Sequence, residues 1–324
     1  MAADKPRAVF LTGPTAAGKT DLSLLLAEEF DGEIVTVDSA QVYRGMDIGT
    51  AKPTAEELAR VPHHLIDLCD PAESYSAAAF RDDALAVMTD ISARGKLPIL
   101  VGGTALYFKA LVQPMAAMPA ADPQLRSQLQ AWLEQDGLPA LVEELQRVDP
   151  EAWARIDRQN PQRVLRALEV QRLSGRPISE FWAQSAHDGR GGLSASALDD
   201  FGWQVVQFGV APTERSVLHQ RIEQRFQLML EQGFIAEVEA LYRRGDLHLD
   251  LPSMRAVGYR QVWQFLDGDL DRAQMIDAGV AATRQLAKRQ LSWMRAWEGL
   301  IWLDSQADDR LDQARQRLRK AKFR

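Results

Sequence analysis

An apolar run that leads directly into a glycine-rich loop constrains the fold more than any other feature of the chain. Residues 7–12 have the composition of a strand, residues 13–20 match G-x-x-x-x-G-K-T, and residues 21–28 have the pattern of a helix. This strand, loop and helix order is the context of a phosphate-binding P-loop. By composition alone, such a string is expected in about one chain of this length in a hundred.

The residue types of this loop suit the binding of an anion. Its glycines let successive backbone N–H groups converge, and the start of the helix and Lys19 add positive charge. The hydroxyl of Thr20 can hold Mg²⁺. The predicted phosphate-binding residues are Gly13, Pro14, Thr15, Ala16, Ala17, Gly18, Lys19 and Thr20.

A second strand, residues 33–37, ends at Asp38. Ligands of open α/β sheets bind beyond the carboxyl ends of the strands, so Asp38 is expected near the P-loop. An aspartate at a strand end commonly caps a helix or forms a turn. Its position beside a phosphate site favours a functional role here. Lys52, in the irregular segment 44–62, fits a solvated charge and a phosphate partner equally well.

The third strand, residues 97–101, indicates the architecture. It follows a helix over 76–94 and precedes another through 111, and such β-α repeats with continuous apolar strands predict a doubly wound parallel sheet of the α/β class. The strand ends in Gly102, Gly103 and Thr104, where a P-loop NTPase is expected to carry an aspartate for Mg²⁺. The usual hydrolytic apparatus is therefore not evident.

Residues 113–203 differ in character from the rest of the chain. Prolines open this segment, and amphipathic helices are expected over 125–135, 138–147 and 161–174. We therefore predict a mostly helical insertion domain over 113–203, within a P-loop core formed by 1–112 and 204–324. Six arginines lie between residues 155 and 176, and taken alone they favour a solvated face.

Composition narrows the function classes. The single cysteine, Cys69, excludes a disulfide framework and a cysteine-based zinc site. No run of 18 apolar residues suggests a membrane span, and the P-loop begins too early for a signal peptide, so a cytoplasmic protein is expected. The net charge of −7 argues weakly against bulk affinity for nucleic acid. The basic helix 283–295, with an interleaved tryptophan, nevertheless suits RNA, whereas 310–324 fits a solvated amphipathic tail.

Six longer blocks, spread over about residues 8–297, carry a family resemblance. They are residues 13–20, 38–53, 102–107, 160–169, 254–261 and 283–290. Block 38–53, DSAQVYRGMDIGTAKP, is long and irregular in composition, which makes it far more specific than the P-loop. Together the blocks resemble the tRNA dimethylallyltransferases of bacteria, and the zinc-binding extension of eukaryotic relatives is absent.

The resemblance implies transfer of a dimethylallyl group from dimethylallyl diphosphate to N6 of the adenosine 3′ of the anticodon (position 37). The P-loop would hold the leaving diphosphate, with Lys19, Thr20 and Mg²⁺ neutralising its charge. Asp38 is the candidate acceptor of the N6 proton, and Thr104 would lie against the target nucleotide as the second catalytic residue. The target base must leave its stack. The implied tRNA contacts are Asp38, Ser39, Ala40, Gln41, Thr104, Arg126, Gln162, Arg163, Val164, Leu165 and Arg166.

The partners expected on this basis are the tRNA anticodon stem-loop, clamped by the insertion domain, and dimethylallyl diphosphate. A monomer that does not bind membranes is expected. Two alternatives share the P-loop and the sheet. One is a small-molecule or nucleoside kinase in which Asp38 activates a hydroxyl. The other is an RNA-binding or regulatory NTPase, against which the missing strand-end aspartate counts.

Overall fold

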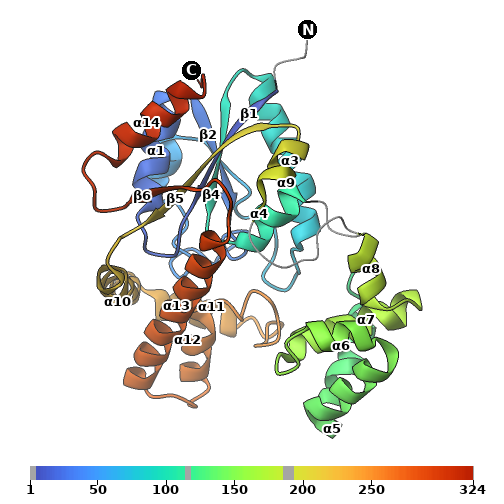
Figure 1. Cartoon of the computed structure of the whole chain (residues 1–324). Helices are drawn as coiled ribbons and strands as arrows, with labels where there is room; N and C mark the ends of the chain where they lie inside the picture. The colour runs from blue at the N-terminus through green and yellow to red at the C-terminus, as the bar shows by residue number, and fades with distance from the viewer. Residues whose placement is uncertain (1–4, 114–117, 185–192, 324) are drawn as a thin grey trace. The chain divides into compact units, whose positions relative to one another are not determined.

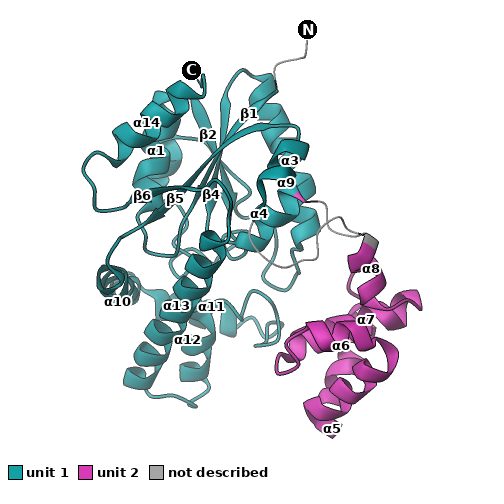
Figure 2. Ribbon diagram, in the orientation of Figure 1, with its two compact units in different colours: residues 1–112, 191–324 teal, residues 113–190 magenta. Residues whose placement is uncertain are grey.

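The computed structural model describes residues 5–113, 118–184 and 193–323, which fall into two compact units. Unit 1 comprises residues 1–112 and 191–324, and unit 2 comprises residues 113–190 (Figure 2). The second unit therefore ends at 190 and not at 203, where the sequence pattern placed its end. The reason is helix α9 (Ala195–Asp200), because Leu193 and Ala197 are buried in the core beside the sheet of unit 1.

Unit 1 is built on a six-stranded sheet in the order β3-β2-β4-β1-β5-β6, in which every pairing is parallel. This confirms the predicted α/β class. The central strand β1 pairs Val9 with Ile99 of β4 and with Val206 of β5. The strands are β1 (Arg7–Thr12), β2 (Gly32–Val37), β3 (His63–His64), β4 (Leu97–Gly102), β5 (Gln204–Ala211) and β6 (Ile301–Asp304).

Helices cover both faces of this sheet (Figure 1). Side chains alternate along β1, so Ala8 and Phe10 enter one core while Val9 and Leu11 enter the other. Both faces are buried, which explains why the strand reads as a continuous apolar run. On the first face lie α3 (Ala77–Ala93), α4 (Ala105–Val112) and α9, and on the second lie α1 (Lys19–Glu29) and α14 (Arg310–Lys320).

The C-terminal segment differs from the solvated tail that the sequence favoured. In α14, Ala314 and Leu318 are fully buried against the sheet, and Phe323 follows them. Arg315 forms an ion pair with Glu29 of α1. The segment is amphipathic as expected, but its apolar face closes one of the two cores. Strand β6, which precedes this helix, was not among the predicted strands.

A helical layer completes unit 1 below the carboxyl edge of the sheet (Figure 1). Its core contains Phe226, Phe234 and Tyr259. A Cβ at Gly279 would lie 2.3 Å from the ring of Phe226, so α10 and α13 can pack this closely only with glycine there. The helices are α10 (Arg215–Glu231), α11 (Phe234–Tyr242), α12 (Tyr259–Leu266) and α13 (Arg272–Arg295). Within the segment 44–62, which was expected to be irregular, Thr54 and Glu57 form a capping box that starts the short helix α2 (Ala55–Arg60).

Unit 2 is helical, with a core of its own that includes Leu129, Leu145 and Leu168. The helices are α5 (Pro123–Val148), α6 (Pro150–Arg155), α7 (Pro161–Ser174) and α8 (Ile178–Gln184). Gly137 has a φ of 78° and breaks α5 into two parts, which correspond to the two helices expected over 125–135 and 138–147. Among residues 5–113, 118–184 and 193–323, no helix is long and apolar enough to cross a bilayer.

Candidate active site

A cavity of about 1230 Å³ lies at the carboxyl edge of the sheet in unit 1. Its walls come from the P-loop, from the segments that follow β2 and β4, and from α10 and α13. This is the edge at which open parallel sheets bind ligands. The lining includes Lys19, Thr20, Asp38, Gln41, Thr104, Arg225 and Gln290.

The P-loop is folded tightly around the side chain of Lys19. Its Nζ donates hydrogen bonds to the carbonyl oxygens of Gly13, at 2.9 Å, and Pro14, at 2.8 Å. Gly18, with a φ of 85°, takes the left-handed conformation that starts α1 at Lys19. The pKa of Lys19 is lowered to about 8, mainly by burial and also by the positive charge of Arg225, while the negative charge of Asp38 opposes both effects. The charged form of Lys19 is therefore disfavoured, both by burial and by the nearby positive charge of Arg225.

Asp38 forms a turn, which is one of the two roles considered from the sequence. Its Oδ1 accepts hydrogen bonds from the backbone N–H groups of Ala40, at 2.8 Å, and Gln41, at 3.4 Å, which makes it a turn former. Its Oδ2 makes no hydrogen bond within the described part of the chain. Burial raises the pKa of Asp38, although the two N–H groups, Lys19 and Arg225 counteract this. A half-buried carboxylate with one unengaged oxygen and a raised pKa is suited to accepting a proton.

The segments after β2 and β4 meet at Thr104. Its Oγ1 accepts a hydrogen bond of 3.1 Å from the backbone N–H of Ser39, and its own N–H donates to the carbonyl of Val37 at 3.2 Å. A Cβ at Gly102 would lie 2.0 Å from that same carbonyl oxygen, so this approach requires glycine. Thr104 and the turn formed by Asp38 are thereby held together.

Gln290, from α13, joins the P-loop to the segment after β4. Its Oε1 accepts a hydrogen bond of 3.0 Å from the N–H of Thr15, and its Nε2 donates one of 3.0 Å to the carbonyl of Gly103. A Cβ at Gly103 would lie 2.2 Å from Nε2, so the second glycine of the Gly-Gly pair makes room for this amide. Gln290 belongs to one of the sequence blocks that carry the family resemblance, but its role was not predicted.

Arg225, from α10, is the other functional candidate that the sequence analysis did not single out. It lines the cavity, and in the described chain its guanidinium has no hydrogen-bond or ion-pair partner. Burial lowers its pKa, while the negative charge of Asp38 acts in the opposite direction. In the sequence it is one cation among several on an amphipathic helix, and nothing local distinguishes it from Arg215 or Arg221.

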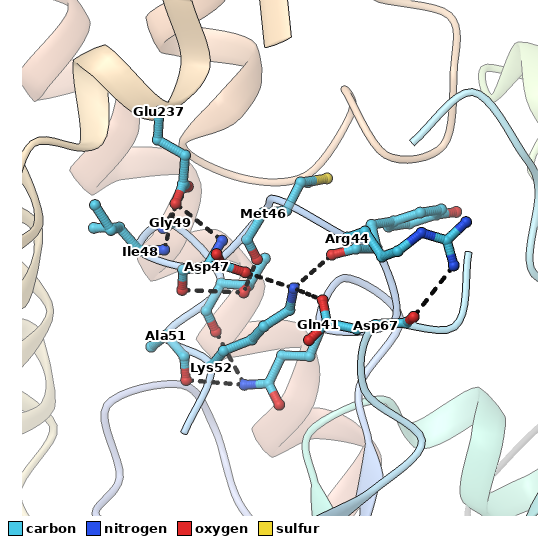
Figure 3. A network of polar contacts seen from close by, with 12 residues as sticks. Gln41, Arg44, Met46, Asp47, Ile48, Gly49, Ala51, Lys52, Asp67 and Glu237 are labelled. Atoms are coloured by element: carbon cyan, nitrogen blue, oxygen red, sulfur yellow. Dashed lines mark hydrogen bonds and ion pairs between the residues drawn. The ribbon is translucent and has the colours of Figure 1, made fainter. Parts of the chain in front are cut away.

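Lys52 fits neither interpretation that the sequence left open. Its side chain is only 6% exposed, and its Nζ donates to the carbonyl of Tyr43 at 2.6 Å and to Asp47 at 2.7 Å. A further ion pair joins it to Asp67 (Figure 3). Lys52 therefore holds its own loop together. The side-chain amide nitrogen of Gln41, a predicted tRNA contact, is likewise engaged by the carbonyls of Thr50 and Ala51.

The residues around Thr20 fit a Mg²⁺ ion whose ligands would be mostly water and oxygen atoms of the bound diphosphate. Thr20 lines the cavity and is exposed. No group of three or more His, Cys, Asp or Glu side chains suited to a metal occurs in the described ranges. Mg²⁺ usually keeps several waters and takes one or two protein oxygens together with substrate phosphates. A hydroxyl beside a phosphate-binding loop meets that requirement.

Unit 2 brings two of its predicted tRNA contacts together on one carboxylate, and a third bonds to one of these two. Glu169 is fully buried, and its Oε2 accepts hydrogen bonds from Arg126 at 2.9 Å and Arg166 at 2.8 Å. Gln162 accepts a further hydrogen bond of 3.4 Å from Arg126. Arg163 is exposed on α7.

Two other predicted contacts, Val164 and Leu165, are fully buried in the core of unit 2. Their side chains pack the helix and are not available to RNA. The tRNA contacts of the other predicted residues remain predictions.

Comparison with known proteins gives one consistent result. The model of the IPP transferase family matches residues 41–297. A tRNA dimethylallyltransferase from Chromohalobacter salexigens is 56% identical over 313 residues, which cover 97% of each chain. These matches confirm the resemblance inferred from the sequence blocks.

Solved structures agree with this. A tRNA isopentenylpyrophosphate transferase from Bacillus halodurans is 39% identical with a TM-score of 0.69, over 98% of this chain and 97% of that one. The enzyme of the same kind from Staphylococcus epidermidis is 32% identical with a TM-score of 0.69, over 98% and 99%. A eukaryotic dimethylallyltransferase acting on tRNA shares the fold, with a TM-score of 0.76 at 23% identity, over 97% of this chain and 78% of that one.

Proposed function

The chain belongs to the IPP transferase family, and we propose on that basis that it transfers a dimethylallyl group from dimethylallyl diphosphate to tRNA. The acceptor is N6 of the adenosine 3′ of the anticodon (position 37), and diphosphate is released. The observation that carries this proposal is that Lys19, Asp38 and Arg225 line one cavity at the carboxyl edge of the sheet. That cavity therefore contains cations for a leaving anion and a carboxylate for a proton.

The reaction exchanges one bond for another. The lone pair of N6 attacks C1 of the donor, and the C1–O bond breaks with its electron pair remaining on diphosphate. One N6 proton passes to the carboxylate of Asp38, whose Oδ2 is available and whose pKa is raised by burial. Thr104, hydrogen-bonded to Ser39, fixes the wall beside this carboxylate.

The diphosphate is the group that the cationic side of the cavity stabilises. Burial lowers the pKa values of both Lys19 and Arg225, and the positive charge of Arg225 lowers that of Lys19 further. A dianionic or trianionic ligand offsets the positive charge of these two side chains. The site therefore favours both binding of the donor and the cleavage of its C1–O bond, which leaves negative charge on diphosphate. Thr20 would hold Mg²⁺ together with the diphosphate oxygens, and the ion would supply further neutralisation of the leaving group.

Unit 2 contributes cationic groups for the tRNA backbone in this proposal. Arg126 and Arg166 are held on Glu169 with their side chains about one-third exposed, at 36% and 31%. Arg163 is exposed beside them. Arginines held in place by a buried carboxylate lose little entropy when they meet a phosphate. We propose that they bind the anticodon stem-loop.

We also propose that the enzyme works as a monomer in the cytoplasm, where its tRNA substrate is found. Light scattering coupled to gel filtration tests this, and a mass near 36.2 kDa is expected.

The deciding experiment supplies purified protein with Mg²⁺, unmodified tRNA and labelled dimethylallyl diphosphate. Label should enter the tRNA, and nuclease digestion should recover it on the adenosine 3′ of the anticodon. A tRNA with guanosine at that position is the matched control and should remain unlabelled. ATP turnover with no label in RNA would instead favour the kinase or the NTPase.

A further inference from the structure

Glu237, on α11, lies where three consecutive backbone N–H groups converge (Figure 3). Its Oε2 accepts hydrogen bonds from the N–H groups of Asp47, at 3.0 Å, and Ile48, at 2.7 Å. Its Oε1 accepts one of 3.2 Å from Gly49 and one of 2.5 Å from the hydroxyl of Tyr259. Successive N–H groups of this kind form a concave anion site, which here is filled by a carboxylate of the same chain.

The packing around this carboxylate leaves the loop little freedom. A Cβ at Gly49 would lie 2.2 Å from the ring of Phe234 and 2.5 Å from that of Tyr259, so the backbone itself rests on two buried aromatic rings. Burial and the negative charge of Glu237 raise the pKa of Tyr259, which keeps its hydroxyl a donor. The loop is therefore fixed both by charge-assisted hydrogen bonds and by contact.

The fixed loop leads back to Asp38. Beyond Gly49, the carbonyls of Thr50 and Ala51 accept hydrogen bonds from Nε2 of Gln41, at 3.1 and 3.0 Å. The N–H of Gln41 in turn donates to Oδ1 of Asp38 at 3.4 Å. Residues 47–51, Gln41 and Asp38 all line the cavity, whereas Glu237 does not. This loop therefore gives Glu237 a hydrogen-bonded path to the site.

We propose that Glu237 is a positioning residue for the transfer reaction, one that sets the orientation of Asp38 through loop 47–51 and Gln41. This inference rests on the proposed function. A residue of α11, nearly two hundred positions from Asp38 in the sequence, would then determine how the proton-accepting carboxylate of Asp38 is placed. The P-loop lies outside this path, so binding of the diphosphate should not depend on Glu237.

The substitution Glu237→Gln tests this because it retains the shape and turns an acceptor oxygen into a donor that faces N–H groups. We expect kcat to fall roughly 10- to 100-fold, as for other displacements of a reacting group, while KM for dimethylallyl diphosphate stays nearly constant. Hydrogen exchange of residues 41–52 should accelerate. Glu239→Gln, on the same helix with an exposed carboxylate paired to Arg243, is the matched control and should behave as wild type.

A double-mutant cycle distinguishes positioning from a general loss of structure. If Glu237 acts through Asp38, then Glu237→Gln lowers kcat in the wild-type background but has almost no further effect in Asp38→Asn. An equal loss in both backgrounds, or an unchanged kcat in Glu237→Gln, overturns the proposal. Should Glu237→Gln not fold, Tyr259→Phe removes one of the four donors, retains the ring and is subjected to the same cycle.

The wild-type assay separates this inference from the proposed function. If wild-type protein transfers no dimethylallyl group to tRNA, the proposed function fails. If it does so and the cycle shows additivity, the function holds and only the role of Glu237 is wrong.

Discussion

Nε2 of Gln290 donates a hydrogen bond of 3.0 Å to the carbonyl oxygen of Gly103, across 187 positions of sequence. The same amide accepts from Thr15 of the P-loop. One side chain thereby sets the distance between the loop that would bind diphosphate and the segment that carries Thr104.

Replacing Gln290 should therefore change both stability and donor binding. Gln290→Leu has nearly the same volume but leaves the N–H of Thr15 and the carbonyl of Gly103 without partners, at a cost of about 1–3 kcal/mol. We expect a lower melting temperature and a higher KM for dimethylallyl diphosphate. Gln285→Leu, an exposed position on the same helix, is the control. A variant with wild-type KM would show that the bridge is only structural.

Removal of the Asp38 carboxylate should affect chemistry more than binding. For Asp38→Ala we expect a turnover lower by about 10² to 10⁴, the usual range for loss of a general base. Affinity for tRNA, measured by filter binding, should remain largely intact. Unchanged turnover would remove Asp38 from the mechanism.

The pH dependence of the reaction should reflect Asp38, which must be deprotonated, and Lys19, which must be protonated. Asp38 must be ionised to accept a proton, and because burial raises its pKa above that of an ordinary aspartate, the rate should begin to fall at a higher pH than it would for such a residue. As pH rises, more of this carboxylate is charged and the rate increases. The profile of kcat/KM measures this limb, which should disappear in Asp38→Asn.

The alkaline limb should come from Lys19. Its charged form binds diphosphate, and its pKa in the free protein is about 8, so affinity should decline as pH rises above that value. Below it the ammonium is fully charged and binding is strongest. Titration calorimetry with inorganic diphosphate, in buffers of different ionisation heat, should detect proton uptake above pH 8. Affinity that is constant up to pH 10 would contradict this assignment.

The sequence predicted those parts of the site whose signals are local. The P-loop and the strand-end position of Asp38 are determined by glycine spacing and by apolar runs, which act over a few residues. Arg225 and Gln290 reach the cavity from distant helices, and a lone polar residue on an amphipathic helix has no local signature. The role of Lys52 depends on Asp67, fifteen positions away, and on a loop path that no periodicity encodes.

In the fold, too, the elements with a local sequence signal were predicted, and those that depend on tertiary contacts were missed. The sheet and most helices could be predicted because burial on one or both faces leaves a period in the sequence. Strand β6 is short, and Trp302 within it is exposed, so its pattern is weak. The end of unit 2 was misplaced because α9 is only six residues long, and its place beside the sheet depends on tertiary contacts of Ala197.

Arg225 offers a direct test of the anion site. Arg225→Ala removes a cation without a protein partner, so we expect little loss of stability and a KM for dimethylallyl diphosphate raised roughly tenfold or more, since a charge-assisted contact contributes about 1.5–3 kcal/mol. Arg225→Lys should recover part of this. Arg215→Ala, exposed on the same helix, is the control. The pKa of Lys19 should also rise in Arg225→Ala because a repelling charge is gone.

Arg163 and Arg166 should behave differently although they lie on one helix of unit 2. Arg163 is exposed, so Arg163→Ala should weaken tRNA binding and reduce the slope of log K against log salt by about one, with no change in melting temperature. Arg166→Ala should have the same effect on binding and also destabilise the fold, because buried Glu169 then keeps only Arg126 as a partner. Arg147→Ala, at an exposed position of unit 2 with 71% of its side chain accessible, is the control. If tRNA affinity and salt slope stay the same in both variants, these arginines do not bind RNA: Arg163 is then a solvated surface charge and Arg166 serves only to pair with Glu169.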